Sequence, residues 1–209
     1  MERMHICDNL LSSLEGGPKT VLGHYRCAGN ALVTLKGGPT FVRDTFNCRE
    51  NSLVSLEGAV DEVAGFNCHS NLLTSLKGGP SSITGGDFVC DHNNIEIIEG
   101  APGEMFGGFS CTYNNLTTLH DVHRHIKRCT GIFNVSSNRI ASCVLGLLLI
   151  EGLRRIIAFA SRDTDVEDAS TIVNAYLKTG SKYDGGSRGR IVDCQNELIE
   201  ANLEDFAKL

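Results

Sequence analysis

Nine cysteines and seven histidines are the chemically most versatile residues of this 209-residue chain. Thiolates and imidazoles bind zinc, cysteine pairs form disulfides, and a thiolate beside a base acts as a nucleophile. The Cys-x-x-Cys spacing of many zinc sites does not occur. Three histidines cluster in His120-Asp121-Val122-His123-Arg124-His125, but no helix is expected there to fix a ligand geometry. For this segment we therefore expect a solvated insertion rather than a zinc site.

Six of the cysteines mark a repeat of 20 to 22 residues, and a seventh, degraded copy has Val135 at the cysteine position. The six are Cys7, Cys27, Cys48, Cys68, Cys90 and Cys111. An aromatic residue, or His5 in the first copy, stands two residues earlier, and side chains two apart on a strand share a face. We predict that both columns are buried and that the thiols pack as small hydrophobic groups. Disulfides, and a zinc ion shared between stacked repeats, are the lesser alternatives.

Asparagine and glycine stand where each repeat leaves its strand. Each cysteine is followed by one member of the series Asn9, Asn30, Asn51, Asn71, Asn93 and Asn114. Side-chain amides pair with backbone groups, so a stacked asparagine ladder is predicted. All four prolines close Gly-Gly-Pro or Gly-Ala-Pro segments, which predict tight turns with positive φ at glycine. The residues before the turn glycines are Glu15, Lys36, Glu57, Lys77 and Glu99, so stacked neighbours should carry opposite charges.

The pattern aromatic-x-Cys-x-x-Asn-x-Leu-x-x-Leu-x-Gly resembles the leucine-rich repeat family in its short bacterial form, over about residues 4–143. The resemblance implies an α/β repeat fold: a solenoid with a parallel concave β-sheet, strand-turn rungs, and extended or 3₁₀ backs. We expect about seven rungs in residues 1–143 and a mainly helical capping subdomain in residues 144–209. The tail around residues 193–203 resembles a C-terminal signature of bacteriophage-encoded repeat proteins.

The expected cap has several elements. A short buried helix or plug is predicted over residues 144–150, and a last strand over 155–159. A helix should start at Asp165 and end near Leu177, followed by a mobile loop over 181–189. A final helix is predicted from about Arg190 to Lys208.

Cys194 is a candidate nucleophile, because in some bacterial effectors leucine-rich repeats precede a cysteine-dependent ubiquitin-ligase domain. It lies on an expected apolar helix face, and no histidine follows His125 in the sequence. A reactive thiolate needs a nearby base or positive group, so core packing is the preferred interpretation. Residues 185–189 lack the Lys-Ser/Thr of a phosphate-binding loop. We expect neither enzymatic activity nor a cofactor.

Function is expected on the outward-facing columns that flank the buried residues of the sheet. Their middle copies are rich in hydrogen-bonding side chains, and arginine and tyrosine often dominate interfaces. The predicted partner-binding residues are Arg26, Asn47, Arg49, Glu50, Asn67, His69, Asp91, His92, Tyr113 and Asn134. The alternative is a solvated polar face without a ligand.

The net charge and the N-terminal sequence predict the class of partner and the cellular location. A formal net charge of −6 and a pI near 5.6 disfavour nucleic acid as the partner. The sequence has no signal-peptide core and no apolar run long enough to cross a bilayer, so a cytoplasmic protein without membrane contact is expected. Residues 4–7 should form an open edge strand, which favours self-association.

The phage-like resemblance implies a non-enzymatic module that binds and inhibits or redirects a bacterial host protein, for instance a defence protein, in the host cytoplasm. A small-molecule binder, such as a sponge for a signalling nucleotide, is the first alternative. It would need converging basic side chains, and the predicted face offers only Arg26 and Arg49. A structural virion component is the second alternative.

Overall fold

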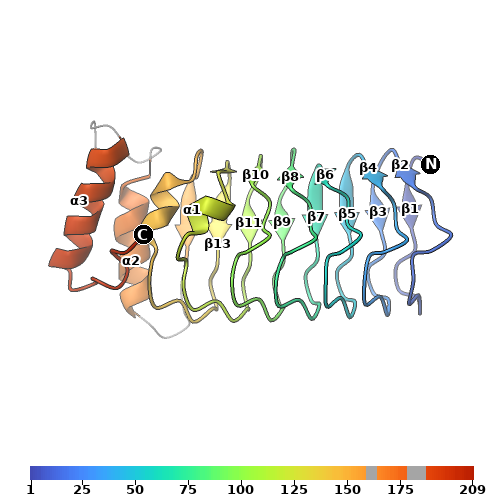
Figure 1. The fold of residues 1–209 in the computed structure, drawn as a ribbon, viewed down its shortest axis with the longest axis horizontal. Helices are drawn as coiled ribbons and strands as arrows, with labels where there is room; N and C mark the ends of the chain where they lie inside the picture. Colours follow the sequence, from blue (N-terminus) through green and yellow to red (C-terminus); the bar gives the residue numbers. More distant parts are fainter. Residues whose placement is uncertain (159–163, 178–186) are drawn as a thin grey trace.

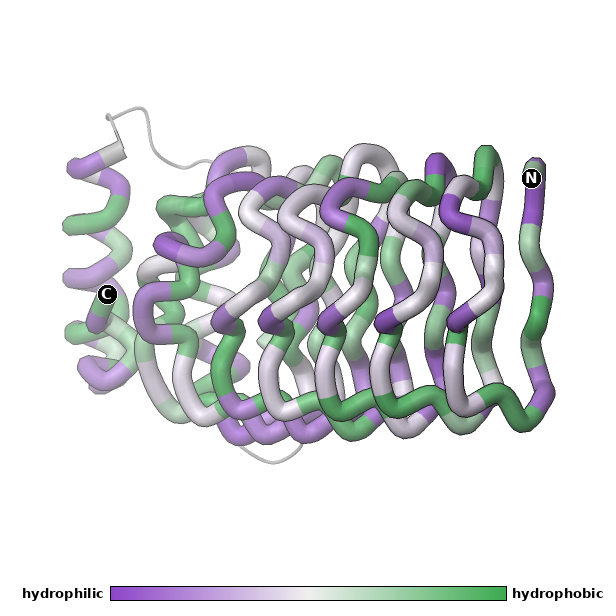
Figure 2. The backbone as a smooth tube through the Cα atoms, turned by 45° about the vertical axis from the view of Figure 1, so that its right-hand side comes forward, coloured by the Kyte–Doolittle hydropathy of each residue, from purple (hydrophilic) through white to green (hydrophobic). Residues whose placement is uncertain are grey.

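The computed structural model describes residues 1–158, 164–177 and 187–209. The predicted end of the last strand at Phe159 and the predicted loop residues 181–186 lie outside these ranges. In the views of Figures 1 and 2 the rungs follow one another along a nearly straight line from the N-terminus to the helices.

Each turn of the chain adds one strand to a parallel main sheet, so the repeats form a β-solenoid of about seven turns. In the described residues this sheet consists of β1 (Met4–His5), β3 (Tyr25–Arg26), β5 (Thr45–Asn47), β7 (Gly65–Asn67), β9 (Phe88–Val89), β11 (Phe109–Ser110), β13 (Ile132–Asn134) and β14 (Arg155–Ile157). Phe46 pairs in register with Tyr25 on one side and Phe66 on the other. The aromatic column thus sets the register, as the repeat spacing predicts.

The returning segments form short strands on another side of the coil. They are β2 (Thr20–Val21), β4 (Phe41–Val42), β6 (Glu62–Val63), β8 (Ser82–Ile83), β10 (Glu104–Met105) and β12 (Arg128–Cys129). The second residue of each is buried, so Cys129 belongs to this back column rather than to the predicted cysteine column. The backs are therefore extended, which was one of the two expected conformations.

The core contains stacked columns of like residues. Neighbouring aromatic rings from Tyr25 to Phe133 have centroids 5.0 to 5.9 Å apart. The cysteines beside them are buried from Cys27 onwards, which confirms the packing prediction for those rungs. For the first rung the prediction is wrong: Met4 pairs with Tyr25, so Met4 and Ile6, rather than His5 and Cys7, pack against the core, and His5 is exposed. All nine cysteines are free thiols, so the disulfide alternative is wrong.

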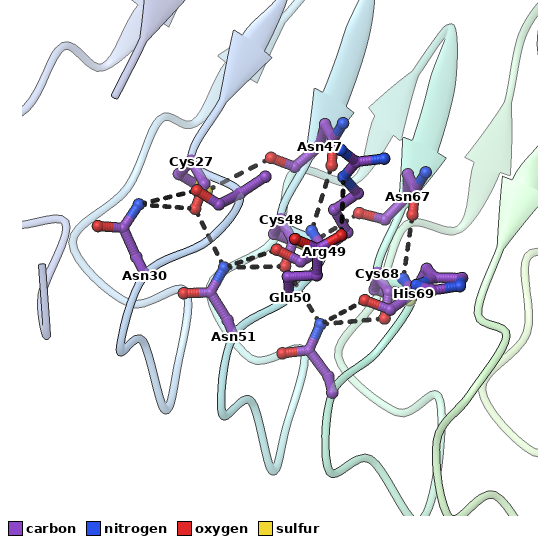
Figure 3. A network of polar contacts seen from close by, with 12 residues as sticks. Cys27, Asn30, Asn47, Cys48, Arg49, Glu50, Asn51, Asn67, Cys68 and His69 are labelled. Carbon is purple, nitrogen blue, oxygen red and sulfur yellow. Dashed lines mark hydrogen bonds and ion pairs between the residues drawn. The ribbon is translucent and has the colours of Figure 1, made fainter. Parts of the chain in front are cut away.

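The asparagine ladder is present, and Asn71 shows its geometry. Its Nδ2 donates to the carbonyl oxygens of Cys48 in the preceding rung (3.1 Å) and Cys68 in its own rung (3.0 Å). Its Oδ1 accepts from the backbone N–H of Leu53 at 2.9 Å. Asn30 and Asn51, which Figure 3 shows, make corresponding bonds. So do Asn93, Asn114 and Asn138. The ladder thus ties successive rungs together through otherwise unpaired turn groups.

The turn glycines and the charge column also follow the prediction. Gly16, Gly37, Gly58, Gly78 and Gly100 all have positive φ. A Cβ on Gly58 would lie 2.5 Å from the backbone nitrogen of Lys36, so close stacking as well as φ requires glycine there. Lys36 pairs with Glu57, and Lys77 with Glu99, each at 2.9 Å.

Helical elements gather at the end of the stack that follows β13 (Figure 1). The 3₁₀ helix η1 (Leu145–Leu149) is largely buried, as predicted for residues 144–150. It is followed by β14, α2 (Thr164–Ala175) and α3 (Ser187–Glu200). Helix α2 contacts β14, and α3 contacts both α2 and η1. The hydrophobic core continues from the solenoid into both helices.

Two helix predictions need correction. Residues 120–125 were expected to lack a helix, yet α1 (Val122–His125) forms one turn, because Val122 and Ile126 are buried and anchor it. The last helix starts at Ser187 and ends at Glu200, not at 190 and 208. Asn202 has φ 59°, and the Leu203 N–H donates to the Leu198 carbonyl at 2.8 Å, which is the hydrogen bond of a Schellman motif.

Candidate functional site

The ten predicted partner-binding residues lie along the solvent side of the main sheet and in the turn after each strand. We call these ten residues the recognition face. None is fully buried, and five of them, Arg26, Arg49, Glu50, His92 and Tyr113, are exposed. Figure 3 shows Asn47, Arg49, Glu50, Asn67 and His69 grouped over neighbouring rungs, beside the asparagine ladder. Stacking thus brings residues about 20 apart in sequence onto one surface.

The residue two places after the cysteine leaves the strand in a left-handed conformation. Gly29 takes this conformation with φ 62°, but in later rungs the same position holds larger residues, including Glu50 (φ 53°), His92 (φ 52°) and Tyr113 (φ 51°). A residue with a Cβ loses about 1–2 kcal/mol in this region. Bulky side chains therefore stand where glycine would fit without strain.

Three rings of the recognition face form a ring ladder, which we define as His69, His92 and Tyr113. His92 and Tyr113 stack with centroids 4.3 Å apart and planes 11° apart. His69 and His92 have centroids 5.0 Å apart at 53°. Tyr113 is 57% exposed although it is stacked, so an aromatic face or edge stays available to solvent. His69 Nδ1 is buried without a hydrogen-bond partner in the described residues.

Four of the predicted residues also stabilise the turns through side-chain hydrogen bonds. The Oδ1 atoms of Asn47 and Asn67 accept the backbone N–H two residues later, at 3.2 and 3.0 Å, and Asn134 does the same at 3.1 Å. Asp91 Oδ1 accepts from Ser110 Oγ and from the Thr112 N–H, both at 2.7 Å. These four side chains are thus fixed in place by the turns they stabilise.

Charges on the recognition face are mixed. Arg49 Nε lies 3.4 Å from Glu50 Oε1, and about half of each side chain is exposed. An exposed pair of this kind stabilises the fold weakly, typically by about 1 kcal/mol or less. Both groups can therefore exchange this contact for one with a partner.

A groove of about 440 Å³ lies where β11, β13 and β14 begin. Its apolar lining includes Phe106 and Ile132, which are 47% and 44% exposed. The Arg128 guanidinium lies 5.5 Å from the centroid of Phe106. Asn134 lines the groove and also belongs to the recognition face. Phe106 and Ile132 were not predicted, because Phe106 lies in the corner after β10 and Ile132 begins β13, at positions where the repeat has no fixed residue type.

Residues 120–125 were considered for metal binding and the thiols for metal binding and nucleophilic catalysis. Over residues 1–158, 164–177 and 187–209, no group of three or more His, Cys, Asp or Glu side chains is placed to hold a metal ion. Burial raises the pKa of Cys27 and Cys194 to about 12, and it raises that of Cys48 and Cys90 well above the ordinary value. Buried thiols of this kind stay protonated and are poor nucleophiles.

Comparisons of the chain with protein-family models, with curated proteins and with solved structures find no match. Among the described helices, none has the length and apolar character needed to cross a bilayer.

Proposed function

We propose that this protein is a non-enzymatic recognition module that binds a partner protein through the recognition face. The repeats are then of the leucine-rich type, with residues 144–209 as their cap. The observation that carries the proposal is the ring ladder. His92 and Tyr113 hold strained backbone positions, their rings stack on a surface open to solvent, and the His69 ring lies tilted against that of His92.

Backbone strain and exposed aromatic area both oppose stability, so they are better explained by binding than by folding. Tyrosine and arginine are the side chains that most often anchor protein interfaces. The Arg49–Glu50 pair adds charges of both signs, which suits a partner with a matched polar surface. The phage-like repeat pattern makes a bacterial host protein, inhibited or redirected in the cytoplasm, the partner we propose.

The test is affinity purification from bacterial lysate, followed by mass spectrometry. The bait is compared with a double variant, His92→Gly with Tyr113→Gly, and with a matched control, Ser70→Gly with Ser137→Gly. All four positions have positive φ, so every change is to the residue that this backbone prefers. We expect a stoichiometric protein with the wild type and the control, and its loss with the double variant. Equal retention by all three baits would refute the proposal.

A second candidate, a small-molecule binder, is favoured by the groove beside Asn134. Its lining combines the apolar Phe106 and Ile132 with polar Ser110 and Asn134, which suits an amphipathic ligand. A metabolite that copurifies with the wild type and is lost from Ile132→Lys, but not from the double glycine variant, would favour this candidate.

A further inference from the structure

The two edges of the main sheet end differently. At the C-terminal edge, Asn174 of α2 takes the place of a further strand: its Oδ1 accepts from the Ile156 N–H at 2.7 Å, and its Nδ2 donates to the Ile156 carbonyl at 2.8 Å. At the N-terminal edge, β1 pairs with β3, and no described residue lies along its other side. Figure 1 shows this rung as the end of the stack farthest from the helices.

The outer side of β1 carries backbone groups that can pair with another strand. The N–H groups of Met4 and Ile6 donate to carbonyl oxygens of the second rung at 3.0 and 2.9 Å. In a parallel ladder alternate residues pair with opposite neighbours, so His5 and Cys7 face the open edge. Asn9 Nδ2 already donates to the Cys7 carbonyl at 2.7 Å, whereas the N–H and C=O of His5 have no partner in the described part of the chain.

The first rung also leaves apolar surface open. Leu10 is 93% exposed, Met1 60% and Leu22 46%. Ile6, which the pairing of β1 with β3 places beside Cys27, is only half-buried, whereas Cys27 is buried. An exposed sheet edge beside apolar side chains is a surface that natural proteins normally cover.

We propose that this edge pairs with β1 of a second copy of the chain, antiparallel and across a two-fold axis perpendicular to the sheet. A head-to-tail stack is blocked, because Asn174 and the helices occupy the other edge. Parallel pairing of two β1 strands would turn one copy over and place the two cores on opposite sides of the joined sheet. The antiparallel two-fold keeps both cores on one side, and it closes at two copies because the edge is then used up.

The dimer has a consequence that rests on the proposed function. The same axis places both recognition faces on one side of the joined sheet. A partner with repeated sites can then bind both faces, and linked binding of this kind raises the apparent affinity without new contacts. Dimerisation itself is independent of that function, because it needs no partner.

Sedimentation equilibrium of the purified 209-residue chain between about 1 and 200 μM tests the proposal, since this range covers ordinary micromolar association. The mass should rise from one copy to two and stop there. His5→Pro removes the outward N–H without touching the ladder to β3, because proline is tolerated where an edge N–H faces away from the sheet. We expect the dissociation constant to rise at least about tenfold, since the two-fold axis duplicates each lost hydrogen bond.

A second variant, Leu10→Lys, leaves the backbone unchanged and replaces an exposed apolar side chain of the first rung with a charged one, so it should weaken the dimer as well if that apolar surface is covered. Val54→Lys is the matched control, because Val54 is also an exposed aliphatic residue (61%) but lies two rungs away from the edge. It should leave the mass unchanged. Circular dichroism checks that each variant is folded. A monomer throughout the range, polymers larger than two copies, or a dimer unaffected by both edge variants would overturn the proposal.

Discussion

Raising the pH from 7 to 10 should destabilise this fold through its buried thiols. Burial raises the pKa of Cys27 and Cys194 from 9.0 to about 12, and it raises the pKa of Cys48, Cys68 and Cys90 far above 9.0 as well. At pH 10 the unfolded chain releases these protons and the folded chain keeps them. Their contribution to stability is therefore full below pH 9 and is lost as the pH rises toward the folded values.

The expected loss depends on the unfolded pKa alone as long as the folded pKa exceeds the working pH. One unit above an unfolded pKa of 9.0, each thiol removes about 1.4 kcal/mol from the free energy of unfolding. The five thiols together remove about 7 kcal/mol, which is comparable to the whole stability of many domains, about 5–15 kcal/mol. We therefore expect the protein to approach unfolding near pH 10.

Urea unfolding followed by circular dichroism at pH 7, 8, 9 and 10, in a reducing buffer, measures the effect. Cys48→Ala should make the loss between pH 7 and 10 smaller by about 1.4 kcal/mol. Leu73→Ala is the control, because it removes buried apolar surface without an ionisable group: it should lower the free energy of unfolding by about 2–5 kcal/mol at every pH. A wild-type stability that is constant from pH 8 to 10, or an unchanged pH dependence in Cys48→Ala, would refute this reasoning.

Three further predictions test the architecture by thermal unfolding. Asn71→Ala leaves buried backbone groups without partners and should remove about 2–4 kcal/mol, whereas Asn9→Ala, whose amide bonds only to its own rung, should remove less than about 1 kcal/mol; equal effects would contradict the ladder. Lys36→Glu places a like charge beside Glu57 and should cost about 1 kcal/mol or less, with the difference disappearing at high salt. Gly58→Ala should cost more than about 2 kcal/mol, because of its φ of 93° and the close backbone beneath it, so a neutral result would argue against that turn.

The main sheet could be predicted because each rung repeats the same chemical requirement. Aromatic residues and cysteines spaced two apart fix which side chains are buried, and Asn71 and its equivalents fix where the strand ends. The alternating Lys36 and Glu57 agree with that stacking register. The back strands could not be predicted as strands, because each is two residues long and contributes a single buried side chain, too little for a pattern.

The candidate site was predictable in position but not in detail. Stacking was enough to gather the ten residues on one face. The separate role of each residue depends on side-chain geometry, which the sequence does not show. Asn47 and Asp91 stabilise turns, whereas His92 and Tyr113 stack with each other. The boundaries of α3 were missed at its C-terminal end because a positive φ at Asn202, rather than a change in hydrophobic pattern, ends the helix.

The affinity of the recognition face for its captured partner tests the central claim most directly. Isothermal titration compares the wild type, His92→Gly with Tyr113→Gly, and the control Ser70→Gly with Ser137→Gly. If the ring ladder anchors the partner, the variant His92→Gly with Tyr113→Gly should bind about 100-fold more weakly, as for two interface hot spots, while its thermal stability does not fall below that of the wild type, because glycine relieves the strain at both positions. A dissociation constant within about twofold of the wild type, which is under 0.5 kcal/mol, would contradict the claim that this face is the binding site.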